Sequence, residues 1–187
     1  AGPAVGGAMR GALGAAMLAV ALAGGAARAA EPPCLLVFGH GRNHEAELPE
    51  QNRQWDLLNA AFNAAVRAPL EQAGRRTVAL VLPVAATDLA RNLELLLAEA
   101  VAHGCSQVLE TTLFADFAAQ TLVARLRLYP LLGSLGPRAA QVLPTVGQPI
   151  FTNQREFDLQ PRVLERLRPQ ALGEEMARQT QQQLPAP

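Results

Sequence analysis

The pattern of apolar and polar positions along the chain predicts strands that alternate with helices. Two continuous apolar runs, residues 35–39 and 77–83, are typical of strands buried on both faces of a sheet. After each run, apolar residues recur every three or four positions, which predicts helices over about 55–73 and 89–103. The helical stripes consist of Trp55, Leu58, Phe62, Val66, Leu70 and Ala73, and of Leu89, Leu93, Leu96, Leu97, Ala100 and Val101.

Signals at the ends of these helices support the assignment. Gly74 and Gly104 can take the left-handed conformation that ends a helix. Thr87 or Asp88 is expected to cap the second helix, because short oxygen-bearing side chains accept hydrogen bonds from its free N–H groups. Pro69 lies inside the first stripe and is expected to kink or split that helix, because proline lacks the N–H that the helix needs.

The second half of the chain favours antiparallel strands. Residues 107–114 read as a third strand, and residues 121–129 alternate with period two, which predicts one buried face and one solvated face. Residues 150–159 form a weaker strand. The fold class is therefore α/β with a mixed sheet in two or three layers. The predicted order is β-α-β-α-β-β-β-α, with the first three strands parallel and an antiparallel hairpin after them.

Two segments in the second half of the chain have no simple strand or helix pattern along their whole length. The stretch from Pro130 to Pro149 is rich in proline and glycine and is long for a loop without structure. It is expected either to have a function or to contain structure that the pattern does not reveal. Helical patterns follow around 163–167 and 172–176, separated by Pro169. The polar tail is expected to fray from about residue 180.

An apolar leader precedes the first strand and resembles a secretory signal peptide. Met9, a candidate start residue, and Arg10 give a positive beginning, and an apolar run over 11–25 follows. Residues 27–29, Ala-Arg-Ala, form a small-x-small cleavage pattern. The run is shorter than the roughly 20 residues that span a membrane. We therefore expect residues 1–29 to be removed, leaving a single periplasmic domain, residues 30–187, without a membrane anchor.

Composition narrows the classes of function. All 16 basic residues are arginine, and the formal net charge is zero. Without Arg10 and Arg28, 14 arginines face 16 acidic residues, a balance that offers no field for nucleic acid. The absence of lysine excludes Schiff-base lysines and the lysine of a phosphate-binding loop. Neither Ser106 nor Ser134 lies in a G-x-S-x-G elbow, which argues against a serine hydrolase.

The two cysteines, Cys34 and Cys105, each precede a predicted strand. If these strands are parallel neighbours, both cysteines lie at the same edge of the sheet and can form a disulfide, as an exported chain with two cysteines usually does. The alternative is a pair of free buried thiols. Two cysteines without a C-x-x-C motif also argue against a thioredoxin-type site or a zinc cage.

One polar loop, His40–Glu50, concentrates chemistry at the carboxyl end of the first strand, where open α/β sheets bind ligands. A metal or anion site here would use nitrogen ligands, oxygen ligands and an anion-clamping guanidinium: His40 and His44, Glu45 or Glu47, and Arg42. The His-x-x-x-His spacing aligns ligands on a helix, whereas a glycine-flanked loop does not align them. The favoured interpretation is a solvated connection, and no cofactor is predicted.

A second candidate surface lies on the strand over residues 121–129. Arg125, Arg127 and Tyr129 share its predicted wet face, and arginine and tyrosine are enriched in interface hot spots. The alternative is an ordinary solvated strand face. In that case Glu110 and Thr112 on the preceding strand simply pair with the arginines across strands.

The segments CLLVFG, LEQAG, AHGCSQVLETTLFAD and TLVARLRLY together give a layout that resembles small α/β domains of bacterial envelope proteins. These include the curli-secretion lipoprotein domain, the activators of penicillin-binding proteins and the N-terminal domain of the Tol translocation protein. The resemblance covers most of residues 34–184, although this chain lacks the cysteine that anchors lipoproteins. It implies a non-enzymatic domain that binds another envelope protein, and it transfers no catalytic residue.

The predicted function is therefore binding or assembly in the cell envelope, with an unidentified protein partner. The competing hypothesis is a small enzyme, or a metal- or anion-binding domain, that uses the His40–Glu50 loop. The oligomeric state is left open.

Overall fold

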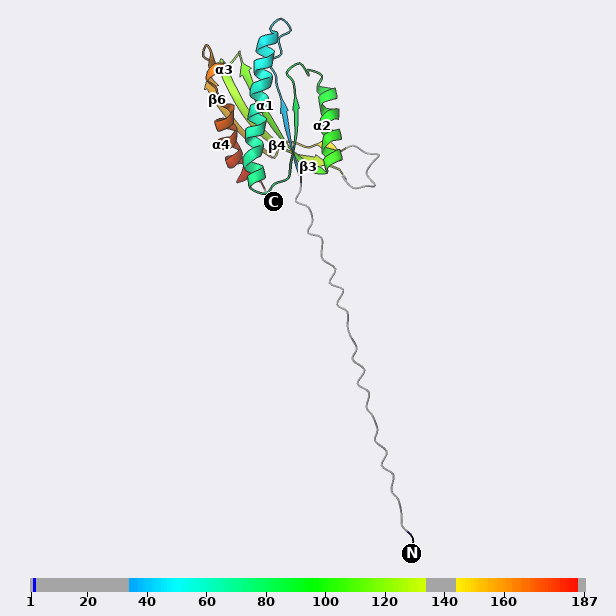
Figure 1. Ribbon diagram of the computed structural model, residues 1–187. Coiled ribbons are helices and arrows are strands. Elements are labelled where there is room, and N and C mark those ends of the chain that lie inside the picture. The colour runs from blue at the N-terminus through cyan, green and yellow to red at the C-terminus, as the bar shows by residue number, and fades with distance from the viewer. Residues whose placement is uncertain (1, 3–33, 134–143, 185–187) are drawn as a thin grey trace. The chain divides into compact units, whose positions relative to one another are not determined.

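The computed structural model describes residue 2, residues 34–133 and residues 144–184. The predicted leader and the middle of the Pro130–Pro149 segment lie outside these ranges. Within them the chain forms the elements drawn in Figure 1: β1 Cys34–His40, α1 Pro49–Gln72, β2 Thr77–Leu82, α2 Leu89–His103, β3 Cys105–Asp116, β4 Thr121–Leu132, β5 Thr145–Val146, β6 Phe151–Asp158, α3 Val163–Arg166 and α4 Pro169–Gln181.

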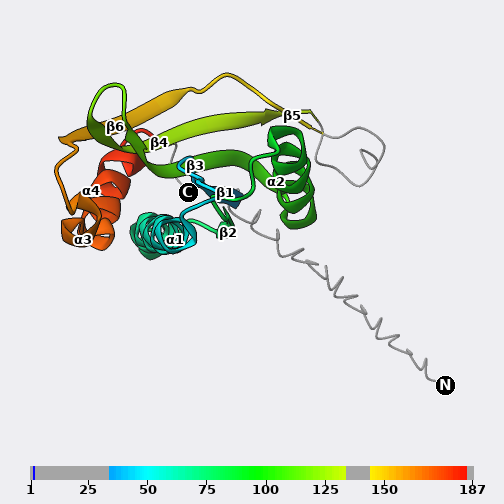
Figure 2. The same cartoon turned by 90° about the horizontal axis from the view of Figure 1, so that it is seen from above.

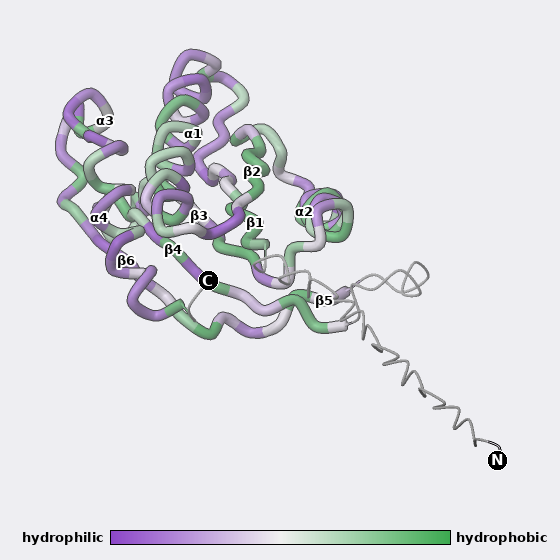
Figure 3. The backbone as a smooth tube through the Cα atoms, turned by 60° about the horizontal axis from the view of Figure 1, so that its bottom comes forward, coloured by the Kyte–Doolittle hydropathy of each residue, from purple (hydrophilic) through white to green (hydrophobic). Residues whose placement is uncertain are grey.

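The strands form one mixed sheet in the order β2-β1-β3-β4, with β5 and β6 both paired to β4. β1 is parallel to β2 and to β3, whereas β3 and β4 form an antiparallel hairpin. The predicted fold class, with three parallel strands followed by antiparallel strands, is therefore confirmed. The apolar runs of β1 and β2 appear mainly in green in Figure 3, where hydropathy is drawn along the backbone.

Alternate residues of β1 divide the core into two parts. Leu35 and Val37 pack with α1 and α4 on one face of the sheet. Leu36 and Phe38 pack with α2 on the other face. Figure 2 shows these two layers on either side of β1. Because α2 packs mainly on β1, β2 and β3, most of β4 and β6 lacks a helix on the α2 side. The molecule thus has three layers at one end of the sheet and two at the other.

The predicted disulfide is present. Cys34 and Cys105 lie opposite each other at the start of β1 and β3, and their sulfur atoms are 1.95 Å apart. Both side chains are buried. The prediction of neighbouring parallel strands with both cysteines at one edge is therefore confirmed.

The ends of α2 are as predicted, and Gly74, with φ of 84°, follows the end of α1 as predicted. Asp88 caps α2 by accepting a hydrogen bond from the Arg91 backbone N–H at 3.0 Å, and Gly104 ends it with φ of 65°. Of the two expected effects of Pro69, a kink or a split, the split is wrong, because α1 runs without a break from Pro49 to Gln72. Pro69 is buried in the last turns of the helix, where packing of the apolar face offsets the single missing N–H.

Two apolar patterns are less buried than expected. β2 is an edge strand that pairs only with β1, and it is half-exposed rather than buried on both faces. On α2, Leu96, Leu97 and Ala100 reach the core, but Leu89 is 79% exposed and Leu93 and Val101 are also exposed. The helix therefore keeps an apolar flank outside the core, and part of this flank borders the site described below.

β4 and α4 are more buried than expected. The buried face of β4 is as predicted, but Val123 and Arg125 on the predicted wet face are buried as well. α4 continues to Gln181, and Thr180 and Leu184 are buried. The expectation of fraying from about residue 180 is therefore wrong as far as residue 184, because Leu184 belongs to the main core.

Two asparagine side chains complete the edge of β3 where β1 stops. Pairing between β1 and β3 ends at Gly39 and Thr111, but β3 continues to Asp116. Asn59 of α1 accepts from the Leu113 N–H at 2.9 Å and donates to the Leu113 carbonyl at 3.2 Å. Asn43 accepts from the Ala115 N–H at 2.7 Å and donates to its carbonyl at 2.9 Å. Buried backbone groups that would have no strand partner are thereby satisfied.

No helix in the described part of the chain is both long and apolar enough to cross a membrane.

Candidate binding site

The structure brings the two predicted candidate sets together on one face of the sheet. His40 is the last residue of β1, and its Nε2 atom lies 2.7 Å from Oε1 of Glu110 on β3. The imidazole also stacks on the Phe38 ring, with centroids 5.2 Å apart. Tyr129 of β4 donates to the other oxygen of Glu110 at 3.1 Å. A residue of the His40–Glu50 loop therefore shares one carboxylate with the predicted interaction face.

Arg127 completes this network. It stands opposite Glu110 in the β3–β4 register, and its Nε atom lies 3.9 Å from Glu110 Oε2. Its Nη1 atom donates to the Tyr129 hydroxyl at 3.4 Å. The predicted cross-strand pairing of Glu110 and Thr112 with the two arginines is thus correct in register, since Thr112 stands opposite Arg125.

The surroundings of Glu110 favour its ionised form. Burial by itself raises the pKa of the carboxyl, whereas the hydrogen bond and the charge of His40 lower it. The charge of Arg125 and the hydrogen bond from Tyr129 act in the same direction, so the pKa of Glu110 lies below its ordinary value of 4.5. The network is therefore built around a carboxylate that stays negative under mildly acidic conditions.

Arg125 lies beside this network, and two of its guanidinium nitrogens have no hydrogen-bond partner among the described residues. It is only 5% exposed, and its Nε and Nη2 atoms are buried without a partner among the described residues. Its guanidinium lies over the Phe114 ring at 5.2 Å, and Arg42 lies over the same ring at 4.8 Å. Burial lowers the pKa of the Arg125 guanidinium and the charge of Arg42 lowers it further, yet arginine remains charged at neutral pH.

Thr112 adds a third orphaned group at the same place. Its side chain is buried, and Oγ1 has no partner within the described ranges. A buried polar group without a hydrogen bond costs about 1–3 kcal/mol, and a charged one costs more. Such groups are rare in native proteins, and each one needs an explanation, such as a bound ion, a water molecule or a functional role. Thr112 and Arg125 thus place three polar atoms, unpaired within the described part of the chain, at opposite positions of the β3–β4 pair.

The remaining loop candidates do not join the site. Asn43 ties the loop to β3, as described above, whereas His44, Glu45 and Glu47 are exposed. The described part of the chain contains no group of three or more His, Cys, Asp or Glu residues placed to hold a metal ion. The structure thus brings His40 and Arg42 to the site and leaves the other three candidates in solvent.

An apolar groove adjoins the network on the side of α2. It has a volume of about 140 Å³. Its walls are Leu89, Asn92, Leu93 and Leu96 of α2 together with Phe38 and His40 of β1. His40 therefore belongs both to the groove and to the charged network. The exposed leucines Leu89 and Leu93 of α2 therefore line this groove. The sequence does not predict the groove, because helical spacing does not show which apolar residues of a helix the sheet will cover.

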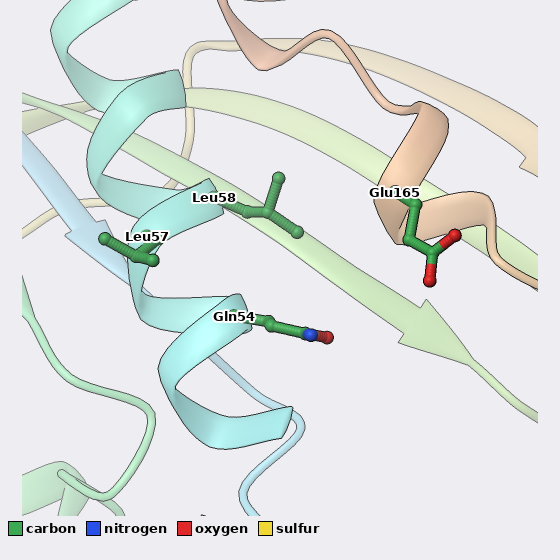
Figure 4. A pocket seen from close by; sticks show the side chains of 4 residues that line it. All are labelled: Gln54, Leu57, Leu58 and Glu165. Carbon is green, nitrogen blue, oxygen red and sulfur yellow. The ribbon is translucent and has the colours of Figure 1, made fainter. Parts of the chain in front are cut away.

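A second groove lies on the opposite side of the sheet, between α1 and α3. Gln54, Leu57 and Leu58 of α1 and Glu165 of α3 line a cavity of about 230 Å³, and Figure 4 shows Gln54 and Leu58 pointing toward Glu165. Trp55, which packs in the core as predicted, borders a neighbouring cavity, and its indole N–H has no partner in the described part of the chain. This groove has no cluster of charged side chains comparable to the one around Arg125, so it is the weaker candidate.

The lowered pKa of Glu110 leads to a testable pH dependence. A carboxyl whose folded pKa lies below its unfolded pKa stabilises the fold above the unfolded value, and this contribution is lost as the pH falls through the folded value. We expect the wild-type protein to exceed Glu110→Gln in unfolding free energy by a constant amount just above pH 4.5, and by progressively less below it. Urea denaturation of both proteins at a series of pH values measures the difference. All other carboxyl groups are present in both proteins, so their contributions to the unfolding free energy cancel. A difference that does not change below pH 4.5 would contradict the prediction.

Comparison with known proteins adds little to this geometry. No protein-family model matches the chain, and no curated protein sequence matches it. Among solved structures, the chain is similar to a PelC dodecamer from Paraburkholderia phytofirmans at 10% sequence identity and a TM-score of 0.36. The similarity covers 79% of this chain and 85% of that chain. At this level the likeness carries no inference about function.

Proposed function

We propose that this chain is an exported, non-enzymatic binding domain that contacts a protein partner in the cell envelope. The contact is made by the β3–β4 surface, which consists of the charged and aromatic residues on the α2 side of the sheet and the adjoining groove. Its residues are Phe38, His40, Arg42, Leu89, Leu93, Glu110, Thr112, Phe114, Arg125, Arg127 and Tyr129. The signal-like leader and the disulfide, which forms in oxidising compartments, support a location outside the cytoplasm.

The observation that carries this proposal is the convergence of an apolar groove and an arginine–tyrosine cluster on a sheet face with little helix cover. Interface hot spots combine large apolar contacts with arginine and tyrosine, surrounded by groups that exclude water. Here the leucines of α2 provide the apolar part, and Arg127 and Tyr129 provide the polar part. His40 joins the two.

The chemistry of the surface indicates the kind of partner. The groove accepts an apolar side chain, and the three arginines of the same surface, Arg42, Arg125 and Arg127, favour a negative one. A polypeptide segment with an acidic residue close to a leucine-like residue meets both requirements. A free ion would leave the groove empty, so a protein segment explains more of the surface than a small anion does.

Site-specific cross-linking in the source bacterium tests the proposal. A photo-reactive amino acid replaces Leu93 or Tyr129 in the full chain, and the matched control replaces Leu57, which is 71% exposed on the other side of the sheet. We expect the first two positions to give the same cross-linked envelope protein, with the attachment in a segment that contains both apolar and acidic residues. The control position should not give it.

Two results would overturn the proposal. One is capture of the same protein from Leu57 as from Leu93 and Tyr129, which would show that contact is not specific to this surface. The other is recovery of the full chain from the cytosol with its leader intact and without any cross-linked protein from either surface position.

A further inference from the structure

We propose that the centre of the β3–β4 surface is an oxyanion site, in which Arg125, Thr112 and Arg42 hold a carboxylate of the bound partner. This inference rests on the proposed function, because it names the chemical group by which the surface recognises that partner.

The first observation is the state of Arg125. Nε and Nη2 lie on one edge of the planar guanidinium, and this edge is the one that binds both oxygens of a carboxylate. Both atoms are buried without a partner in the described part of the chain. The Phe114 ring lies against the guanidinium and holds its plane in place. A pair of aligned donors is therefore ready for an acceptor that the fold itself does not supply.

The second observation is Thr112, which is independent of the arginine. It stands directly opposite Arg125 across the β3–β4 pair, and side chains in such pairs have Cβ atoms about 4.5–5.5 Å apart. Its hydroxyl is also buried without a partner among the residues that the structure describes. A hydroxyl and a guanidinium can both donate hydrogen bonds to an oxygen, so a single anion can accept from both.

The third observation is the balance of charge. Arg42 and Arg125 lie over the same ring, and Arg127 is two residues along the strand. Glu110 is the carboxylate that acts on Arg125, and its two oxygens are already occupied by His40 and Tyr129.

On the neighbouring strand, Gln154 stands opposite Arg125 and donates to Glu156 Oε1 at 2.6 Å. The acidic side chains of the surface therefore do not complete Arg125, and positive charge remains in excess.

Access to Arg125 depends on a side chain that can move. Arg42 belongs to the loop after β1 and is exposed, and exposed side chains change rotamer within nanoseconds. Arg42 lies over the same Phe114 ring as Arg125, so we infer that movement of its side chain admits an anion and that its return places a second guanidinium on the bound anion. An acidic side chain on a partner segment is slender enough to enter in this way.

Arginine-detected NMR of the full chain tests this site. The Nε–H signal of Arg125 is followed during titration with a short peptide, acetyl-Leu-Glu-Leu-amide, and separately with inorganic phosphate. We expect a saturable shift of this signal. Thr112→Val should weaken binding about tenfold, the effect of losing one hydrogen bond to a charged group. Arg125→Met should abolish binding, and Arg53→Gln, which removes an exposed arginine from α1, should leave it unchanged.

The two probes distinguish the source of the oxyanion. Tighter binding of the peptide supports a partner carboxylate, and tighter binding of phosphate supports an oxyanion site filled by a phosphate group instead. The absence of a saturable Arg125 shift with either probe overturns the proposal. Thermal stability gives a second measurement: Arg125→Met should be at least as stable as the wild type, because it removes two orphaned buried donors. Loss of stability and binding together would show that Arg125 is structural and overturn the site.

The two proposals fail separately. A positive titration, for a chain that is recovered from the cytosol with its leader intact and gives no cross-linked partner, would overturn the proposed function and leave the oxyanion site standing. A partner that Arg125→Met still captures as well as the wild type does would overturn the oxyanion site and leave the function standing.

Discussion

Reduction of the Cys34–Cys105 disulfide is expected to lower the unfolding free energy by about 4 kcal/mol, from the entropy of closing a loop in the unfolded chain. The two cysteines are 71 residues apart in sequence, so the bond removes many extended conformations from the unfolded chain. The typical stability of a domain is about 5–15 kcal/mol, and a loss of this size would leave the reduced protein marginal. Urea denaturation with and without a reducing agent measures the difference.

Comparison of the reduced and oxidised proteins measures the contribution of the disulfide bond alone, because the reduced protein keeps both cysteine side chains in the core. The denaturant dependence m should also rise on reduction, since the unfolded chain then exposes more surface. The Cys34→Ala/Cys105→Ala variant is expected to be at least as unstable as the reduced wild type, because it also loses buried volume. Equal stability of the oxidised and reduced proteins would contradict the prediction and make the bond irrelevant to folding.

This dependence links stability to compartment. In the cytosol, where thiols stay reduced, the chain would lose the contribution of the disulfide. Outside the cytoplasm it would gain that contribution after export. If the chain is exported, as proposed, the reduced form would therefore be easier to keep unfolded before translocation than the oxidised form after it.

Much of the fold could be predicted from local patterns. The continuous apolar runs marked β1 and β2, and the helical repeat marked α1 and α2. Asp88 and Gly104 set the ends of α2 through cap chemistry that needs no knowledge of the rest of the chain. These predictions succeeded because each one depends on interactions between residues that are close in sequence.

The predictions that failed depend on what covers a surface. Period two placed Arg125 on the correct face of β4, but alternation does not reveal whether side chains from other strands and loops cover that face. Leu89 and Leu93 have helical spacing, yet both remain exposed on the flank of α2 that does not face the core. Burial of a given face is a property of neighbours in space, and the sequence names those neighbours only when the order of strands is known.

The candidate site shows the same limit. His40 and Glu110 are 70 residues apart in sequence, and they meet only because β1 lies beside β3 in the sheet. The sequence analysis placed His40 and Arg42 in one hypothesis and Arg125, Arg127 and Tyr129 in another. Strand order merges the two hypotheses into one surface, whereas His44, Glu45 and Glu47 remain outside it.

The second large effect is expected from Asn59→Ala in α1, which should lower the unfolding free energy by about 2–6 kcal/mol. Asn59 is buried, and its amide pairs with both the N–H and the carbonyl of Leu113. Truncation leaves two backbone groups of β3 buried without partners. Each such group costs about 1–3 kcal/mol, because water cannot reach it.

The same helix offers a matched control. Asn52 also pairs reciprocally with one residue, accepting from the Glu45 N–H at 3.0 Å and donating to the Glu45 carbonyl at 2.7 Å, but at a solvent-accessible position. Asn52→Ala loses the same two hydrogen bonds, and water replaces them, so a loss of about 1 kcal/mol or less is expected.

Urea denaturation of both variants compares the loss of the same pair of side-chain to backbone hydrogen bonds at a buried site and at an exposed site. Equal effects of Asn59→Ala and Asn52→Ala would show that the end of β3 is open to water. In that case Asn59 would not serve in place of the β1 strand that stops at His40.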